Sequence, residues 1–317
     1  MKRSTARALG VLFPLMLLTA ASTPEAIPLP GDRLFPESVS IAADGTAYAG
    51  SMTGGVVRAS MKTGKAELWI KPGAYGAGSL YGVLADKRNR MLWVCTNDFS
   101  ARGLVVTGAD AGHLLKGFDL RTGEGKVSLP LPGEKPVCND MAVARDGSVL
   151  VTDTGAPQVY RWRPGATALE TWLSDPILNA PKGGGLDGIA FGGDGNLYLN
   201  NVRSGELYRV EVGRDGKAGK VTRLTLSRPL VSPDGMRPIG GLDFALAEGD
   251  GHIDRVSVSG DHAEIHTLAE GVAAPTGVDV YAGKIWYVQG QLSYLFDPAK
   301  RGTTPGSFRL TPVSMTR

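Results

Sequence analysis

Short apolar runs that alternate with polar residues recur along the whole chain, and no window keeps a helical period for a dozen residues. Three of these runs share one layout, in which a polar residue opens an apolar run and an Asp-Gly pair begins seven residues later. The three copies open at Glu37, Asn139 and Asp187. Because glycine tolerates the positive φ of a tight turn, an Asp-Gly pair between two apolar runs predicts a β-hairpin.

Looser copies of the unit open near Leu80, at Asp234 and at Thr276, which makes six units. They are spaced by about 40 to 60 residues, the length of one propeller blade. A third apolar run continues the unit, as at 55–59, 158–162, 206–210 and 291–295, and a weaker fourth follows, as at 168–172. The sequence therefore predicts an all-β fold, a six-bladed β-propeller of four-stranded antiparallel blades.

A propeller ring closes when one terminus of the chain adds a strand to an incomplete blade. Residues 26–29 and residues 308–313 both have a suitable pattern, and the sequence does not choose between them. The residues that follow the N-terminal 22 are numerous enough for one large β domain or for two smaller ones. We predict a single propeller domain over residues 23–317.

The first 22 residues have the pattern of a secretory signal peptide. Lys2, Arg3 and Arg7 are basic, residues 8–18 are mostly apolar, and small residues follow at 19–21. An uncleaved membrane anchor is the alternative, although the apolar stretch is short for a bilayer. No later segment has about twenty consecutive apolar residues. We therefore expect a periplasmic or secreted protein with no stable membrane insertion after signal cleavage.

Charge and motif spacing argue against two classes of ligand. The formal charge of +3 includes the three basic residues of the leader, so the remaining chain is close to neutral and has no basic block for nucleic acid. The glycines at 183–188 have the spacing of a dinucleotide-binding loop, but a strand pattern follows them. No helix N-terminus is then available for a pyrophosphate.

Cys95 and Cys138 are the only cysteines. They can form a bridge in an oxidising compartment, but two cysteines define no disulfide framework, so their pairing stays open at this point. The histidines fall in outer runs or loops and match no catalytic motif, which predicts surface positions: His113, His252, His262 and His266.

Polar residues open the inner strands of the predicted blades, and inner strands line the central channel of a propeller. These residues should therefore be neighbours around the axis: Glu37, the pair Leu80 and Tyr81, Asn139, Asp187, Asp234 and Thr276. Three carboxylates in one channel repel each other unless a cation neutralises them. An all-oxygen ligand set suits Ca²⁺ and other hard divalent ions. The alternative is that these residues only shape turns, but Glu37 is a poor turn residue.

A second polar set closes the second strands, at Asp153, Asn201 and Glu248. We expect these residues to lie away from the mouth of the metal site and to serve mostly in turns and in hydrogen bonds between blades.

Four motifs in order resemble the SMP-30/gluconolactonase/LRE-like family over residues 35–297. They are residues 35–37, Asn139-Asp140 with 149–153, residues 186–188, and residues 233–236. The resemblance implies a six-bladed propeller with a divalent metal, often Ca²⁺, in its central channel, and an activity on lactones.

The resemblance also implies roles for individual residues. Glu37 and Asp234 match the family's carboxylate ligands, and Asp234 also matches the proposed general base or acid. Asn139 matches the asparagine that faces substrate near the metal, and Asp187 stands where an asparagine ligand is common. An arginine that binds substrate in some members is replaced by Val137, which puts a sugar lactone in doubt.

These expectations define a candidate mechanism. Glu37, Asn139, Asp187 and Asp234 bind a divalent metal, most simply Ca²⁺, with Zn²⁺, Mg²⁺ or Mn²⁺ as alternatives. The metal polarises a lactone carbonyl, Asn139 and Tyr81 contact the substrate, and Asp234 takes a proton from water. Activation of the water by the cation itself is an equally good interpretation, because metal binding makes a carboxylate a weak base. A non-enzymatic periplasmic propeller that binds a ligand or protein, and a quinone-dependent oxidoreductase, are the competing classes.

Overall fold

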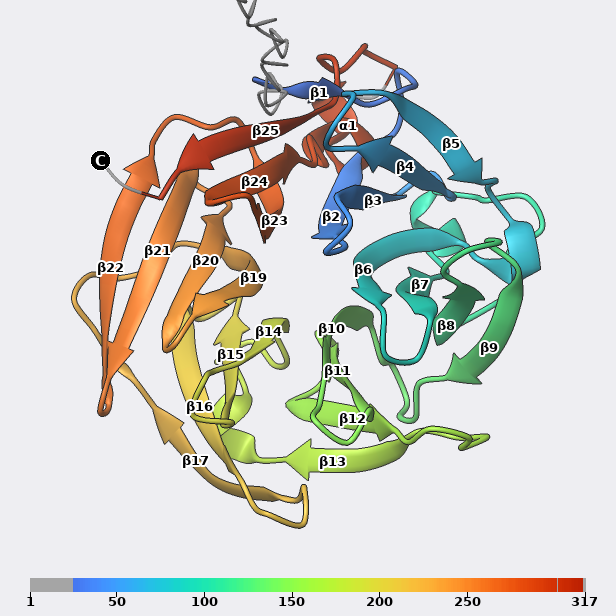
Figure 1. The fold of residues 1–317 in the computed structure, drawn as a ribbon. Coiled ribbons are helices and arrows are strands. Elements are labelled where there is room, and N and C mark those ends of the chain that lie inside the picture. Colours follow the sequence, from blue (N-terminus) through green and yellow to red (C-terminus); the bar gives the residue numbers. More distant parts are fainter. Residues whose placement is uncertain (1–24, 301, 316–317) are drawn as a thin grey trace, which may run out of the picture.

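Six antiparallel sheets form a closed ring around a central channel (Figure 1). The computed structural model describes residues 25–300 and 302–315, so the leader predicted over residues 1–22 lies outside the described residues. The all-β, six-bladed prediction is confirmed. Within the part of the chain that is described, no helix is long and apolar enough to span a bilayer.

Blades 1 to 3 are consecutive meanders of four strands. They comprise β2 (Pro36–Ile41), β3 (Thr46–Ser51), β4 (Val56–Ser60) and β5 (Ala66–Ile70); β6 (Ser79–Asp86), β7 (Met91–Asn97), β8 (His113–Asp119) and β9 (Gly125–Pro130); and β10 (Cys138–Val143), β11 (Val149–Asp153), β12 (Gln158–Trp162) and β13 (Glu170–Ser174).

Blades 4 and 5 repeat the meander, and blade 5 gains a short fifth strand. They comprise β14 (Leu186–Phe191), β15 (Leu197–Asn201), β16 (Glu206–Val212) and β17 (Ala218–Arg223), followed by β19 (Pro233–Gly240), β20 (Asp243–Glu248), β21 (His252–Ser259) and β22 (His262–Ala269). The extra strand β18 (Thr225–Leu226) pairs in parallel with β22.

Both candidate terminal strands are used in blade 6. This blade holds β23 (Pro275–Tyr281), β24 (Lys284–Gln289), β25 (Arg309–Ser314) and β1 (Ile27–Pro28), in that order from the channel outward. The C-terminal strand β25 pairs with β24, and the N-terminal β1 covers its outer edge, with Ile27 opposite Leu310. The ring is therefore closed by both ends of the chain.

The predicted third strand at 291–295 is wrong. Gln291 has a positive φ, and the chain then forms the single helical turn α1 (Ser293–Phe296). The later run Arg309–Ser314 takes the third position, because its alternating side chains match β24 over five residue pairs. Residues 290–308 thereby become a long connection on one end of the ring.

The hydrophobic core lies between neighbouring blades. Alternate residues of each strand face the next sheet, as the period of a β-strand requires. Trp93 of blade 2 and Trp162 of blade 3 illustrate this packing, with ring centroids 4.7 Å apart. Burial of such surfaces between all six sheets fixes the relative positions of the inner strands.

An irregularity recurs at the channel end of every blade. The pairing of the inner strand with the second strand shifts register after the first residue in five sheets and after the second residue, Leu80, in blade 2. Two residues of each inner strand lie inside this shift, and the first of them is the polar residue that opens the repeat in five blades and Tyr81 in blade 2. A local bulge re-aims side chains, here toward the axis.

Glycine occupies the second position of the shift in four blades, because the next blade approaches closely there. A Cβ on Gly82 would lie 2.3 Å from the carbonyl oxygen of Asn139, and one on Gly188 would lie 2.6 Å from that of Asp234. Gly235 and Gly277 face their neighbours in the same way. The glycines thus allow the channel residues of adjacent blades to converge.

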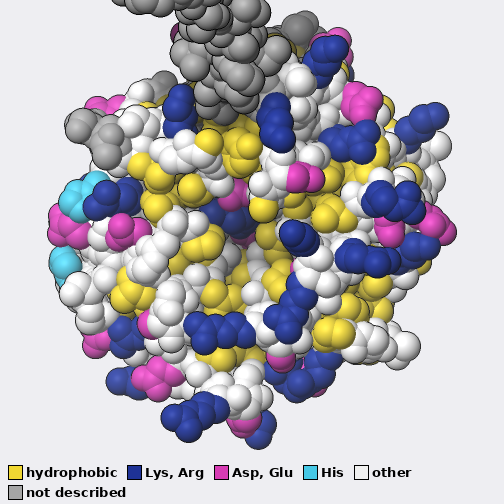
Figure 2. All heavy atoms as spheres, viewed as in Figure 1, with side chains coloured by type: hydrophobic (Ala, Val, Ile, Leu, Met, Phe, Trp, Pro, Cys, Tyr) yellow, Lys and Arg dark blue, Asp and Glu magenta, His cyan; other side chains and the backbone are white. Residues whose placement is uncertain are grey.

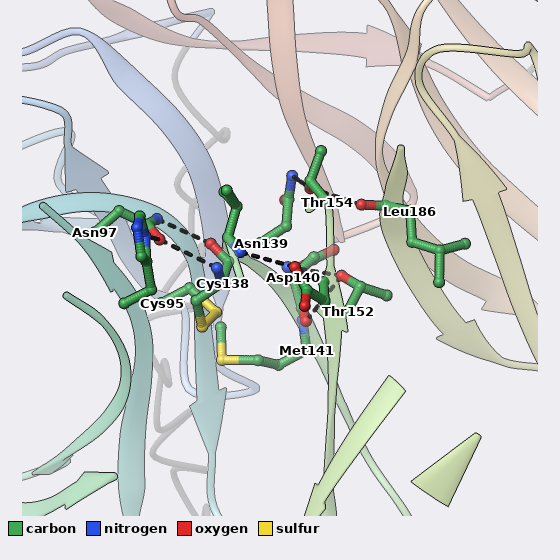
Figure 3. The surroundings of a disulfide bond; sticks show 12 residues. Cys95, Asn97, Cys138, Asn139, Asp140, Met141, Thr152, Thr154 and Leu186 are labelled. Atoms are coloured by element: carbon green, nitrogen blue, oxygen red, sulfur yellow. Dashed lines mark hydrogen bonds between the residues drawn. A yellow bond between two sulfur atoms is a disulfide. The ribbon is translucent and has the colours of Figure 1, made fainter. Parts of the chain in front are cut away.

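The two cysteines, whose pairing the sequence left open, form a disulfide with a Cα–Cα distance of 5.1 Å. The bridge joins β7 of blade 2 to the first residue of β10 in blade 3. Figure 3 shows Asn97 and Asn139 on either side of it. It therefore lies directly beside one of the predicted site residues.

Candidate metal centre and active site

The inner strands bring the predicted residues together at one end of the channel. Glu37, Asn139 and Asp187 are buried, while Asp234 and Tyr81 are only half-buried. The bulges in β2, β6, β10, β14 and β19 place them there. Thr276, the sixth residue of the set, donates its hydroxyl to the Pro36 carbonyl at 3.0 Å and so connects blade 6 to blade 1.

Hydrogen bonds link two of these side chains. Nδ2 of Asn139 donates to Oδ2 of Asp187 at 2.8 Å and to Oγ1 of Thr154 at 2.7 Å. Oδ1 of Asp187 is buried and receives no hydrogen bond from an N–H or hydroxyl group of the described residues.

Burial is the largest cause that raises the pKa of each of the three acids. Burial raises the pKa of Glu37 well above its usual range, and Asp187 and Asp140 raise it further. Burial, followed by Asp140, raises the pKa of Asp187 to about 7. Burial, Asp187 and Glu37 raise the pKa of Asp234. The buried channel therefore favours the protonated form of these acids over the charged form.

A buried ion pair that the sequence analysis missed lies in the same channel. Arg237 in β19 donates to both carboxylate oxygens of Asp140 in β10, at 2.5 Å and 2.9 Å. Its charge lowers the pKa of Glu37 and of Asp187, against the larger effect of burial. Asp140 was visible beside Asn139 in the motif, but nothing in the sequence indicates that Arg237 reaches it across 97 residues.

The donor set fits a hard divalent cation. It offers carboxylate and amide oxygens only, it contains the unpartnered Oδ1 of Asp187, and its acids repel each other. The side-chain oxygens of Glu37, Asp187 and Asp234 do not all lie within 4.8 Å of one another. Figure 2 shows one face of the ring, hollowed at its centre, where acidic and basic side chains lie among apolar ones.

One group in the described part of the chain does meet that distance, namely Glu248, Asp250 and His252. Glu248 is already engaged, because Arg228 forms an ion pair with it at 2.6 Å and the Val231 amide donates to it. His252 Nδ1 lies 2.7 Å from Asp250 Oδ1. These contacts are those of a structural cluster at the β20–β21 turn.

The expectation that Asp153, Asn201 and Glu248 lie away from the mouth is wrong. Their backbones pair with Cys138, Leu186 and Pro233, each one residue before a channel residue. Antiparallel pairing places the end of a second strand beside the start of the first. They lie one strand outward at the same end, and Asp153 has the expected turn role, accepting from the amides of Val137 and Gly155.

Of the histidines predicted at the surface, only His113 has a contact near the site. It is half-buried, and its Nδ1 lies 2.7 Å from Oδ1 of Asn97.

Known proteins share the fold of this chain at low sequence identity. A family model described as "Strictosidine synthase-like, N-terminal" matches residues 22–59. No curated protein has a significantly matching sequence. The fold recurs in a putative gluconolactonase, with 16% identity, 92% of this chain and 93% of the other covered, and a TM-score of 0.63.

Two further solved structures show the range of proteins with this fold. A gluconolactonase from Xanthomonas campestris has 16% identity over 92% of this chain and 98% of its own, with a TM-score of 0.60. A catalytically inactive virginiamycin B lyase from Staphylococcus aureus has 17% identity over 78% and 75%, with a TM-score of 0.56. Such likenesses show a shared fold. They are consistent with the resemblance to the SMP-30/gluconolactonase/LRE-like family.

Proposed function

We propose that this protein is a divalent-metal-dependent hydrolase that opens a cyclic ester, a lactone, at the end of its central channel. The observation that carries the proposal is the convergence of Glu37, Asp187 and Asp234 from three blades, since a divalent cation would relieve their repulsion. The gluconolactonases among its structural neighbours support the choice of substrate class.

Glu37, Asn139, Asp187 and Asp234 would hold the ion, and their oxygen donors favour Ca²⁺. Zn²⁺, Mg²⁺ and Mn²⁺ are the alternatives. A cation bound there supplies a Lewis acid that polarises an ester carbonyl and stabilises negative charge on its oxygen.

The side chains divide the remaining tasks. Asp234 is half-buried and so is the acid most accessible to substrate, and its carboxylate accepts the proton of the attacking water. Asn139 is held by Thr154 and Asp187, which fixes the amide that orients the ester. Tyr81 contacts the substrate at the rim.

We further propose that the protein is exported. The disulfide supports this assignment, because such bridges persist in oxidising compartments. The basic and apolar leader in the sequence agrees with it.

Metal analysis of the purified protein combined with acid release from a panel of lactones tests the function. We expect turnover that a chelator removes and Ca²⁺ restores, and a loss of at least about 100-fold in Asp234→Asn. Glu264→Gln is the matched control, since this side chain is exposed on the outer strand β22. Unchanged activity in Asp234→Asn would exclude the mechanism, and bound metal without turnover on any lactone would indicate a binding protein.

A further inference from the structure

Two long connections extend from the same end of the ring as the candidate site. Residues 98–112 join β7 to β8 in blade 2, and residues 290–308 join β24 to β25 in blade 6. The matching connections in blades 1, 3 and 4 have four residues each, 52–55, 154–157 and 202–205. Blades 2 and 6 flank blade 1, so the two long connections stand on either side of Glu37.

The two connections contact each other through aromatic rings. The ring of Phe99 lies edge-on to that of Phe296, with centroids 6.3 Å apart. The exposed guanidinium of Arg102 lies over Phe296 at 4.2 Å. Leu292 and Phe296 also pack against the hydrophobic cluster of blade 1. The connections thus form one apolar wall.

Tyr81 joins this wall to the carboxylates. Its ring lies 5.4 Å from that of Phe99. Tyr81 occupies the same place in the register shift of β6 that Glu37 occupies in the neighbouring inner strand β2. Burial, followed by the negative charge of Glu37, raises the pKa of the Tyr81 hydroxyl. Leu104 and Val137 pack against the same cluster and stay half-buried. Val137 lies two residues before Asn139, so the wall adjoins the start of β10.

This wall suits one kind of substituent. Its half-buried members next to the site, Tyr81, Leu104 and Val137, offer one hydroxyl, that of Tyr81. Each hydroxyl of a sugar ring, by contrast, needs a hydrogen-bond partner when it leaves water. The surplus of carboxyl groups in the channel also disfavours an anionic ligand. Apolar side chains that remain half-exposed beside a polar centre gain free energy when an apolar group covers them.

We propose that the substrate of this site is an uncharged lactone whose alkyl or aryl substituent packs against the half-buried side chains of Tyr81, Leu104 and Val137. The inference rests on the proposed lactonase function and specifies its substrate class.

The test compares δ-lactones that carry alkyl tails of increasing length with gluconolactone. We expect kcat/KM to rise about threefold per added methylene, with gluconolactone the poorest substrate. The matching δ-lactams, which resist hydrolysis, give a second readout by calorimetric binding. Val137→Ser should remove the dependence on tail length. Leu104→Ser, at the other half-buried position, should have the same effect and serves if the first variant folds poorly. Leu68→Ala, on the outer strand β5 and 49% exposed, is the control.

The outcomes separate the inference from the proposed function. Tail-dependent lactam binding without hydrolysis of any lactone would support the apolar subsite and contradict the lactonase. Hydrolysis that ignores tail length, or that prefers gluconolactone, would overturn the subsite and leave the lactonase standing. Tail dependence that persists in both wall variants would also overturn it.

Discussion

The side chain of Asn97 forms hydrogen bonds with both the amide and the carbonyl of Cys138. Nδ2 of Asn97 donates to the Cys138 carbonyl at 2.9 Å, and Oδ1 accepts from the Cys138 amide at 3.1 Å. The disulfide fixes the side chain of Cys138 at the same time. The residue before Asn139 is therefore restrained at three points, which makes Asn97 a positioning residue for the site.

Replacement of this side chain should affect both stability and the site. Asn97→Ala leaves the buried amide and carbonyl of Cys138 without partners, so we expect a loss of about 1–3 kcal/mol in the free energy of unfolding. Because Asn139 follows, kcat should fall more than the affinity for substrate. Urea unfolding and steady-state kinetics measure the two effects. Wild-type kinetics in a destabilised variant would contradict the positioning role.

Removal of the disulfide should destabilise the chain. We expect Cys95→Ala with Cys138→Ala to lower the free energy of unfolding by about 2–5 kcal/mol, because the bridge restricts the unfolded chain. Wild-type protein under a reducing agent is the comparison, and it should approach the double variant. Equal midpoints with and without the bridge would contradict this expectation.

Breaking the buried ion pair of Arg237 and Asp140 should lower the free energy of unfolding more than loss of the Asn97 side chain does. Arg237→Met removes the cation and leaves Asp140 as an uncompensated buried charge, so we expect a cost of about 3–5 kcal/mol. Adding Asp140→Asn to the variant should recover part of the loss. Denaturant unfolding of the wild-type protein, the single variant and the double variant tests this. A double variant that is less stable than Arg237→Met would contradict the pairing.

The glycines of the bulges should tolerate no side chain. In Gly82→Ala the new Cβ meets the carbonyl oxygen of Asn139, a backbone atom that cannot turn aside, so we expect a loss of about 1–3 kcal/mol. In Gly219→Ala, on β17, the nearest atom is at 3.2 Å and the change should be small. Thermal unfolding compares the two, and similar midpoints would refute the close approach.

The metal-free protein should lose stability as the pH rises. The pKa of Asp187 is raised to about 7 in the folded chain, above its value of about 4 in the unfolded chain. The folded state then binds more protons between these values, so its advantage is complete below about pH 4 and is lost as the pH rises through about 7. Unfolding in chelator across pH 4–8 measures the slope, which Asp187→Asn should flatten. If Asp187→Asn left the dependence of unfolding free energy on pH unchanged, that dependence would come from other groups.

Repetition made most of the fold predictable. The Asp-Gly turns at fixed offsets specify hairpins, and six such units specify the ring. The same offsets aligned Glu37, Asn139 and Asp187 at equivalent positions, which the structure brings together. The third strand of blade 6 was predicted wrongly because a long connection separates β24 from β25. The apolar run at 291–295 lies nearer in the sequence and was assigned to that strand.

Contacts between blades were not predictable in the same way. The pairing of Arg237 with Asp140 and the hold of Asn97 on Cys138 depend on how sheets are placed around the axis, which no local pattern encodes. The position of Glu248 was misjudged for a simpler reason. The second strand of a hairpin runs antiparallel to the first and therefore ends beside the start of the first. Glu248, fourteen residues after Asp234, thus lies at the same end of blade 5 as Asp234.

Strand β1 pairs only with β25 in the sheet of blade 6. During synthesis the first of these strands emerges almost a full chain length before its partner exists, so this pair must form late. Until then blade 6 has an unprotected edge, at which another molecule could add a strand. Completion of the C-terminal strand β25 is thus the event that commits the chain to a closed ring.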